Sequence, residues 1–306
     1  MFSEGPDTSK HFLKSLGSLG HENVEFLSAF ENLEEMIRKR NKCKDGSLKG
    51  EYKIILGFTS NMISCGLREV ICYLVRNRLV DAIVTTAGGV EEDLIKCVGG
   101  ETYLGSFADS GSKLRDLGLN RVGNLLIPSS NYANFEDFIT PIFDEVAAEA
   151  QPKTPSEFIG LLGKGVNSEE SVYSWCSRNS IPAFCPALTD GSIGDMLFFY
   201  NFNSTKLSID VLRDVDLLNR FIGESTHGTG IILLGAGLPK HHILRACRMS
   251  KSLADSVVQI STGDLIDSRT GSTDASGITQ DARVTTIQAD ATVVFPLLVS
   301  ALVATG

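Results

Sequence analysis

The chain has 306 residues, of which 42% are hydrophobic and 21% charged, and its formal net charge is −9 at pH 7. This length and composition predict a globular protein with a substantial core, and the acidic charge argues against nucleic acid as the main partner. No apolar stretch approaches the roughly 20 residues of a membrane-spanning helix, so we expect no membrane insertion.

The seven cysteines are scattered along the chain, and no two stand at Cys-x-x-Cys spacing. An odd number without this spacing favours reduced thiols in a cytoplasmic protein over disulfides or a zinc site. The first residues contain neither the basic nor the apolar segment of a secretory signal, which also favours a cytoplasmic location.

Weak helical periodicity marks the start of the chain. Apolar residues at helical spacing predict helices within residues 1–50, and the basic, polar run at residues 39–47 predicts a solvated loop. No repeat, low-complexity tract or clear linker follows. We therefore expect a single domain over residues 1–306, with residues 1–50 as a helical N-terminal extension.

Strand and helix patterns alternate from residue 52 onwards. The apolar run at residues 54–58 predicts a buried strand, and a second strand is expected at residues 81–85. The helix between them has one apolar face, formed by Leu67, Val70, Ile71, Leu74 and Val75. This βαβ unit predicts a parallel sheet with a right-handed crossover. The loops after the two strands should then lie side by side at one edge.

Two glycines and three acids follow the second strand, in the stretch Ala87-Gly88-Gly89-Val90-Glu91-Glu92-Asp93. The glycines permit a sharp turn, and we expect the acids in the first turn of the next helix, where the helix dipole favours carboxylates. Capping alone would explain one acid. Three acids together indicate a pocket for a cationic ligand at the carboxyl edge of a parallel sheet.

The later elements are predicted in less detail. Residues 99–150 resemble an insertion with one helix near residues 135–150, and Thr154 with Pro155 predicts a capped helix start. Residues 167–171 open another helix. Further strands are expected at residues 181–187, 231–234 and 257–260, and an apolar helix over residues 293–303.

Several strand ends carry the polar groups that suit a nucleotide. Asp190 or Asp290 could accept hydrogen bonds from ribose hydroxyls, and Ser60, Asn61 and Thr86 could donate to phosphates. Each of these residues alone is explained equally well by a helix cap or a turn. The only glycine turn that resembles the dinucleotide fingerprint, at residues 235–237, is a fragment of it and is weak by itself.

Histidines offer a second, weaker signal. His241 and His242 could form an acid/base or metal pair, but no carboxylate stands at ligand spacing, so we expect no metal site.

Six blocks in a fixed order resemble the signature of the deoxyhypusine synthase family. They are residues 58–64, 85–93, 121–125, 186–195, 240–243 and 289–292. The resemblance covers about residues 54 to 303. It implies an α/β fold with a Rossmann-like parallel sheet flanked by helices, NAD as the cofactor, and a tetramer with active sites at dimer interfaces.

The resemblance also implies an activity and its residues. The family oxidises spermidine, holds the aminobutyl group as an imine on a lysine, and transfers it to a lysine of translation initiation factor 5A. The residues implied to line the NAD site are Ser60, Asn61, Ser64, Thr86, Ala87, Gly88, Asp190, Thr262, Asp290 and Ala291. Those implied to face the polyamine are Glu91, Glu92, Asp195 and His241, a cluster whose carboxylates would compensate the ammonium groups.

One departure from the family matters most. Counting back from Ala289 without gaps places Gly277 at the position of the nucleophilic lysine, and no lysine follows Lys251. An imine needs an amine, so the covalent step is lost. Lys240 is a poor substitute, because the family has a lysine there in addition to its nucleophile. The loop at residues 267–277 is also shorter than in the family, and contains Arg269.

The sequence therefore resembles the catalytically degenerate regulatory paralogue of kinetoplastid protozoa. Such a subunit would pair with an active deoxyhypusine synthase in a heterotetramer, with His241 as its one residual catalytic group. Two alternatives stay open: an independent NAD-dependent polyamine-acting enzyme, and a module that only binds NAD or polyamine.

Overall fold

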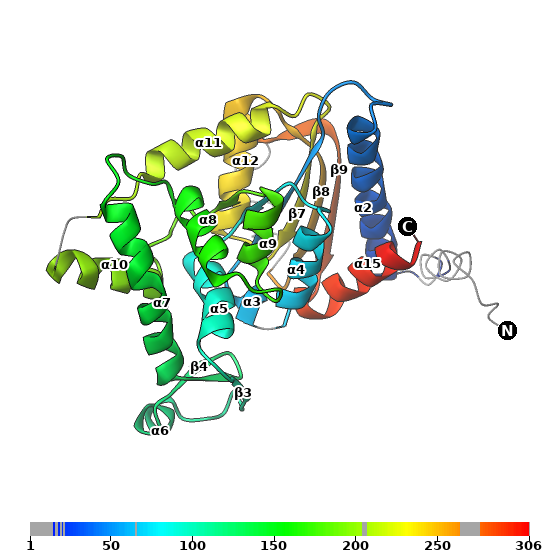
Figure 1. Cartoon of the computed structure of the whole chain (residues 1–306). Coiled ribbons are helices and arrows are strands. Elements are labelled where there is room, and N and C mark those ends of the chain that lie inside the picture. Colours follow the sequence, from blue (N-terminus) through cyan, green and yellow to red (C-terminus); the bar gives the residue numbers. More distant parts are fainter. Residues whose placement is uncertain are drawn as a thin grey trace. The chain divides into compact units, whose positions relative to one another are not determined.

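The computed structural model describes residues 22–64, 66–203, 207–263 and 276–305, together with residues 15, 18 and 20. Six strands form a parallel sheet in the order β6-β2-β1-β7-β8-β9, and three short strands form an antiparallel sheet. Helices flank the parallel strands (Figure 1), so the predicted α/β fold class is confirmed. No helix within the described residues is long and apolar enough to cross a membrane.

Chain contacts separate two compact units, the first formed by residues 1–58, 79–81 and 218–306 and the second by residues 59–78 and 82–217. The single-domain organisation stays a prediction, and residues 1–14 of the expected extension lie outside the described residues.

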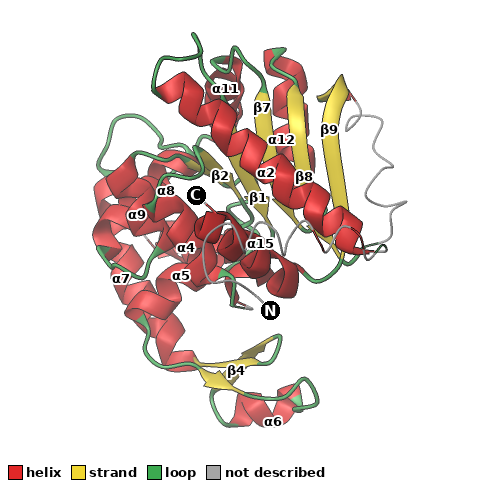
Figure 2. Cartoon of the chain, turned by 90° about the vertical axis from the view of Figure 1, so that its right-hand side faces the viewer, coloured by secondary structure: helices red, strands yellow, loops and turns green. Residues whose placement is uncertain are grey.

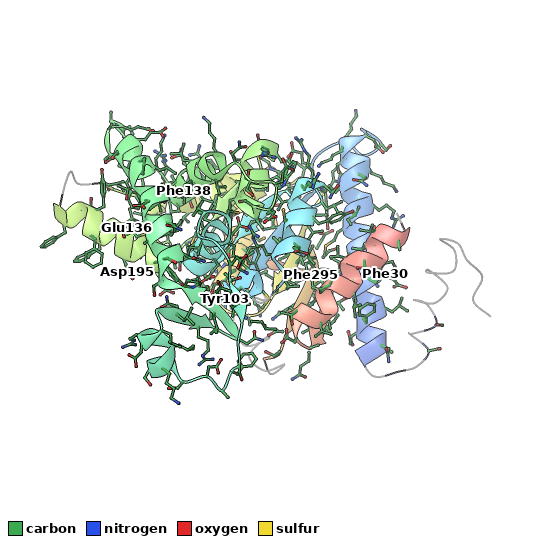
Figure 3. The ribbon with its side chains drawn as sticks, turned by 60° about the horizontal axis from the view of Figure 1, so that its bottom comes forward. Phe30, Tyr103, Glu136, Phe138, Asp195 and Phe295 are labelled. Atoms are coloured by element: carbon green, nitrogen blue, oxygen red, sulfur yellow. The ribbon has the colours of Figure 1, made fainter. Side chains whose placement is uncertain are left out.

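The first unit contains four adjacent parallel strands: β1 (Lys53–Phe58), β7 (Thr229–Leu234), β8 (Ala254–Ser261) and β9 (Ile278–Gln288). β1 and β7 are buried along their whole length, as expected for strands covered on both faces. Helix α2 (Glu22–Lys44) crosses one face of these strands, and α12 (Leu238–Ser250) lies on the other (Figure 2). Helix α15 (Ala291–Thr305) packs on α2, where Phe30 and Phe295 are buried (Figure 3).

The predicted loop at residues 39–47 is wrong in its first half, because α2 continues through Lys44. Its basic residues have tertiary partners. The guanidinium of Arg40 lies 2.8 Å from the Asp81 carboxylate, and Lys39 Nζ lies 2.6 Å from Asp255. These ion pairs stabilise helical residues that the sequence presents as a polar run.

The second unit is mostly helical around two short strands. Its elements, besides the arm described next, are α3 (Asn61–Ser64), α4 (Arg68–Arg76), β2 (Ala82–Val84), α5 (Ala87–Val98), α7 (Ser129–Ala147), α8 (Pro155–Val166), α9 (Val172–Asn179), β6 (Ala183–Phe184), α10 (Ser192–Asn203) and the start of α11 (Val211–Gly223). The predicted strands at residues 181–187, 231–234 and 257–260 are thus present as β6, β7 and β8.

The expected insertion forms an arm that projects from α5 and α7 (Figures 1 and 2). It consists of β3 (Tyr103–Leu104), α6 (Gly111–Asp116), β4 (Leu119–Val122) and β5 (Leu125–Pro128). α7 begins at Ser129, earlier than predicted. Asn131 donates to the carbonyls of Gly100 and Glu101, and Asn134 donates to that of Gly99, so the start of α7 is tied to the chain leaving α5.

Thr154 caps α8 as predicted. Its Oγ1 accepts from the N–H of Glu157 at 3.2 Å, the Glu157 carboxylate accepts from the N–H of Thr154 at 2.9 Å, and Pro155 opens the helix. This reciprocal pair satisfies two backbone donors that the helix leaves unpaired.

We expect Thr154→Ala to lower the free energy of unfolding by about 1 kcal/mol, because the N–H of Glu157 loses its acceptor. Urea unfolding measures the change. Thr140→Ala is the control, since Thr140 lies inside α7 and bonds only to the carbonyl of Glu136; it should change stability by less than about 0.5 kcal/mol. Equal losses in both variants would contradict the capping role.

Candidate functional site

Only Thr85 and Thr86 connect the end of β2 to the start of α5. Ala87 is the first residue of α5, so both glycines belong to its first turn and the acids lie in the second. The predicted separate glycine turn, with the acids in the first helical turn, is therefore wrong. A Cβ on Gly88 would stand 2.7 Å from the Cβ of Ser60, so glycine lets this helical turn approach the neighbouring loop closely.

The prediction that the two loops lie side by side is confirmed. The N–H of Ser60 donates to Thr86 Oγ1 at 3.1 Å. Ser64, four residues further on, is buried, and its Oγ has no hydrogen-bond partner among the described residues. Asn61 is exposed and Thr86 half-buried.

Glu91 is buried and points to the start of α10. One carboxylate oxygen accepts the N–H of Ile193 at 3.0 Å. A Cβ on Gly191 would lie 2.7 Å from both carboxylate oxygens, so any other residue there would require the Glu91 carboxylate to move. Burial raises the pKa of Glu91, and so does the charge of Asp195, while the N–H groups of Ile193 and Ser192 lower it.

Glu92 is the unsatisfied member of the acid pair. Its side chain is 6% exposed, and its Oε2 has no hydrogen-bond partner within the described part of the chain. Burial, and then the charge of Glu91, raise the pKa of Glu92 to about 7, against a lowering effect of Lys96. A buried carboxylate with an unpaired oxygen is stabilised by protonation or by a neighbouring cation.

Asp93 has a different role from the one expected. Its carboxylate pairs with Arg68 Nε at 2.7 Å and accepts from Ser171 Oγ at 2.7 Å and from the N–H of Val172 at 3.2 Å. It therefore stabilises the N-terminus of α9 and the packing of α4. Of the three acids, Glu91 and Glu92 thus remain as candidates for the predicted cation site.

Two neighbours of the acid pair were not identified from the sequence. Lys96 donates to the carbonyl of Ile63 at 3.0 Å and lies four residues after Glu92 on α5. That i,i+4 spacing is a signal that could have found it. Tyr132 comes from α7, beyond the arm, and no pattern marks it; burial, then Glu92 and Glu91, raise its pKa to about 12.

Asp190 and Asp195 are exposed at the loop before α10 and in its first turn. Figure 3 shows Asp195 on α10, close to α7. Together with Glu91 and Glu92, Asp195 belongs to the one region of the second unit where the implied polyamine carboxylates gather.

The remaining implied residues belong to the first unit. His241 is exposed on α12, Thr262 is exposed after β8, and Ala291 is buried at the start of α15. Asp290 Oδ1 accepts from the N–H and the Oγ1 of Thr292, at 2.9 and 2.7 Å, and these bonds lower its pKa. The capping interpretation thus accounts for the contacts of Asp290.

The comparisons agree with one another. A family model described as deoxyhypusine synthase matches residues 11–302. The chain belongs to the deoxyhypusine synthase family. It is 42% identical to the deoxyhypusine synthase of Kluyveromyces lactis over 96% of this chain and 87% of the relative, and 43% identical to a homospermidine synthase of Senecio vulgaris over 98% and 86%. A crystal structure of a candidate deoxyhypusine synthase from Entamoeba histolytica matches with a TM-score of 0.71 and 29% identity, over 95% of this chain and 92% of that one.

Within this deoxyhypusine synthase fold, Gly277 stands immediately before β9 and is buried. A Cβ built on it would lie 2.3 Å from the carbonyl oxygen of Leu244 on α12. No side chain fits there unless the backbone moves. Residues 264–275, including Arg269 and most of the loop expected to be short, lie outside the described residues. The Kluyveromyces alignment spans 333 positions, more than the 306 residues here, so that relative has segments that this chain lacks.

Glu92 should give stability a pH dependence. The pKa of glutamate in an unfolded chain is about 4.3, and the folded chain raises it to about 7. The folded chain then binds the proton more tightly, so the free energy of unfolding should fall as pH rises from about 4.5 to 7 and level off above that.

Glu92→Gln should remove this fall, as measured by urea unfolding at a series of pH values. Glu136→Gln, at an exposed position on α7, is the control and should keep the wild-type slope. A wild-type slope in the Glu92 variant would show that its pKa is not raised.

Proposed function

We propose that this chain is a regulatory, catalytically impaired subunit of deoxyhypusine synthase. It pairs with an active paralogue in a heterotetramer and supports NAD-dependent transfer of the aminobutyl group of spermidine to a lysine of translation initiation factor 5A. The observation that carries the proposal is at Gly277. Gly277, which we assign to the position of the nucleophile by counting back from Ala289, has no amine, and the carbonyl of Leu244 lies where a side chain would begin.

The state of Glu92 supports polyamine binding. An ammonium group beside it would give Oε2 the partner it lacks and would lower the pKa of the carboxyl. Glu91 is held in place by the N–H of Ile193, so the pair is preorganised. Asp195 and His241 are the further groups that we assign to the polyamine.

The NAD assignment has two parts. In the second unit we assign it to Ser60, Asn61, Ser64, Thr86, Ala87, Gly88 and Asp190, and in the first to Thr262, Asp290 and Ala291. The buried, unpartnered hydroxyl of Ser64 supports the first part, because such a group needs a partner. When bound, NAD supplies hydride acceptance, and the residues of this chain bind and orient it.

The retained acid pair supports a chemical role for this chain over a role as a scaffold only. A subunit that served only to hold its partner would have no need for a buried carboxylate without a partner, which destabilises the fold. We therefore propose that the pocket serves a site whose lysine comes from the active paralogue. The alternatives are an independent NAD-dependent polyamine-acting enzyme and a binding module.

Co-expression with an active paralogue separates these functions. We expect no aminobutyl transfer to translation initiation factor 5A by this chain alone and a large rise in the rate of the mixed enzyme, measured by transfer of labelled spermidine. Full transfer by the purified chain alone would contradict the proposal. An unchanged partner rate would favour the alternatives.

Variants of this chain in the mixed enzyme test its chemical role. Glu92→Gln or His241→Ala should lower the mixed rate by about tenfold or more, the scale of losing a charged contact to substrate. Glu136→Gln is the matched control, because Glu136 is exposed on α7, and it should leave the rate unchanged. If all three variants behave as wild type, this chain supplies no contact to the site.

Gly277→Lys should not restore an imine, because the new Cβ would meet the carbonyl of Leu244. We expect a loss of roughly 1–3 kcal/mol in stability from overpacking and no borohydride-trapped adduct at position 277 by mass spectrometry. Ser276→Lys, at the half-buried neighbouring position, is the control and should cost less stability. A trapped adduct at position 277 would show that the site is intact apart from its lysine.

A further inference from the structure

Lys96 connects α5, which carries the acid pair, to the end of α3. It lies in the last turn of α5, four residues after Glu92. Its Nζ donates to the carbonyl oxygens of Ile63 at 3.0 Å and of Ser64 at 3.4 Å. A helix leaves its last carbonyl groups without partners inside the helix. Lys96 supplies such partners from a neighbouring helix, so it fixes the end of α3.

The start of α3 is attached to the same part of the chain. The N–H of Ser60 donates to Thr86 Oγ1 at 3.1 Å, and Gly88 lets the first turn of α5 approach Ser60 closely. Lys96 attaches the other end, which carries Ser64. The hydroxyl of Ser64 is buried and has no partner among the described residues, so its position depends on how α3 is held.

The ammonium group of Lys96 also acts on Glu92. At i,i+4 spacing the two residues lie on one side of α5, and helical side chains lean toward the N-terminus, so that of Lys96 extends toward Glu92. Burial and the charge of Glu91 raise the pKa of Glu92, and Lys96 opposes them. The positive charge therefore favours the ionised carboxyl, which is the form that binds a cation.

Other titratable groups on the helices packed against α5 act less directly. Tyr132 on α7 has a pKa raised to about 12, so it is neutral at pH 7. Asp195 on α10 acts on Glu91, and α3 has no titratable side chain. Those of α8 and α9 are not among the groups that shift the pKa of Glu92; they are Glu157, Lys164, Tyr173, Cys176 and Arg178.

We propose that Lys96 is a positioning residue of this site, which holds α3 against α5 and keeps Glu92 in the anionic form that receives an ammonium group. The ligands themselves, NAD at α3 and a polyamine at Glu92, rest on the proposed function. One side chain then links the two binding segments, because the contact that fixes α3 also places a positive charge near Glu92.

Lys96→Met removes the charge and both hydrogen bonds, and it can be tested without any ligand. In urea unfolding of the purified full chain at a series of pH values, the wild-type free energy of unfolding should level off near pH 7. Without Lys96 the folded chain keeps the proton on Glu92 to higher pH, so the variant's curve should go on falling for about one further pH unit. Lys96→Arg should restore the wild-type curve. Lys164→Met is the matched control at an exposed position on α8 and should also keep it.

Two further measurements separate the charge from the packing. The double variant Lys96→Met/Glu92→Gln should lose the extra fall, because the carboxyl that titrates is gone. Hydrogen exchange of the amides of residues 61–64 should be about tenfold faster in Lys96→Met than in the wild type or in Lys96→Arg, because opening of α3 becomes easier. Lys96→Gln repeats the charge test if Lys96→Met does not fold.

A wild-type pH curve in Lys96→Met overturns the electrostatic part of the proposal, and unchanged exchange in α3 overturns the positioning part. An extra fall that persists in the double variant also contradicts it, because another group then titrates. These measurements use neither polyamine nor paralogue, so their failure is distinct from failure of the proposed function. In the mixed enzyme, the acid side of the pH–rate profile should move to higher pH in Lys96→Met. A stability curve that shifts while this profile stays in place shows that the reaction does not use the charge of Glu92.

Discussion

The second unit is arranged around the burial of three consecutive carboxylates on one helix. Glu91, Glu92 and Asp93 are each no more than 6% exposed. Burying an ionised carboxylate is strongly unfavourable unless hydrogen bonds or opposite charges compensate it. The neighbouring elements provide this unequally. Asp93 receives Arg68 from α4 and the N-terminus of α9, and Glu91 receives one N–H from α10. Glu92 receives no hydrogen bond at Oε2 from the residues that the structure describes.

The three carboxylates therefore differ in how fully they are hydrogen-bonded, although they lie within a single helical turn. A fully satisfied carboxylate such as Asp93 has nothing left to offer a ligand. Glu92 keeps an open oxygen and a pKa near neutrality, so its charge responds to what is placed beside it. A buried carboxylate with incomplete hydrogen bonding is suited to bind a cation, because the cation compensates its charge.

The sequence predicted what depends on local pattern. The apolar runs of β1, β7 and β8 and the Thr154 cap follow from periodicity and short-range chemistry, so they are found where expected. The features that were predicted wrongly depend on contacts with residues that are distant in the sequence. α2 continues through a basic run because Asp81 and Asp255 form ion pairs with it. Asp93 is not available to a ligand because Arg68 and Ser171 bind its carboxylate. Tyr132 approaches the acid pair only because α7 returns after the arm. The family resemblance identified Glu91 and Glu92, but only their hydrogen bonding in the structure distinguishes how they behave.

Gly277 and Gly57 both pack closely against α12. Its Leu244 carbonyl stands where a Cβ on Gly277 would be, and a Cβ on Gly57 of β1 would lie 2.7 Å from Ile243 Cδ1. α12 therefore packs closely against β1 as well. His241 lies three residues before Leu244 on the same helix. A side chain at position 277 would therefore require either residue 277 or the backbone of α12 at Leu244 to move. A shift of α12 would also change the position of His241, which lies on the same helix.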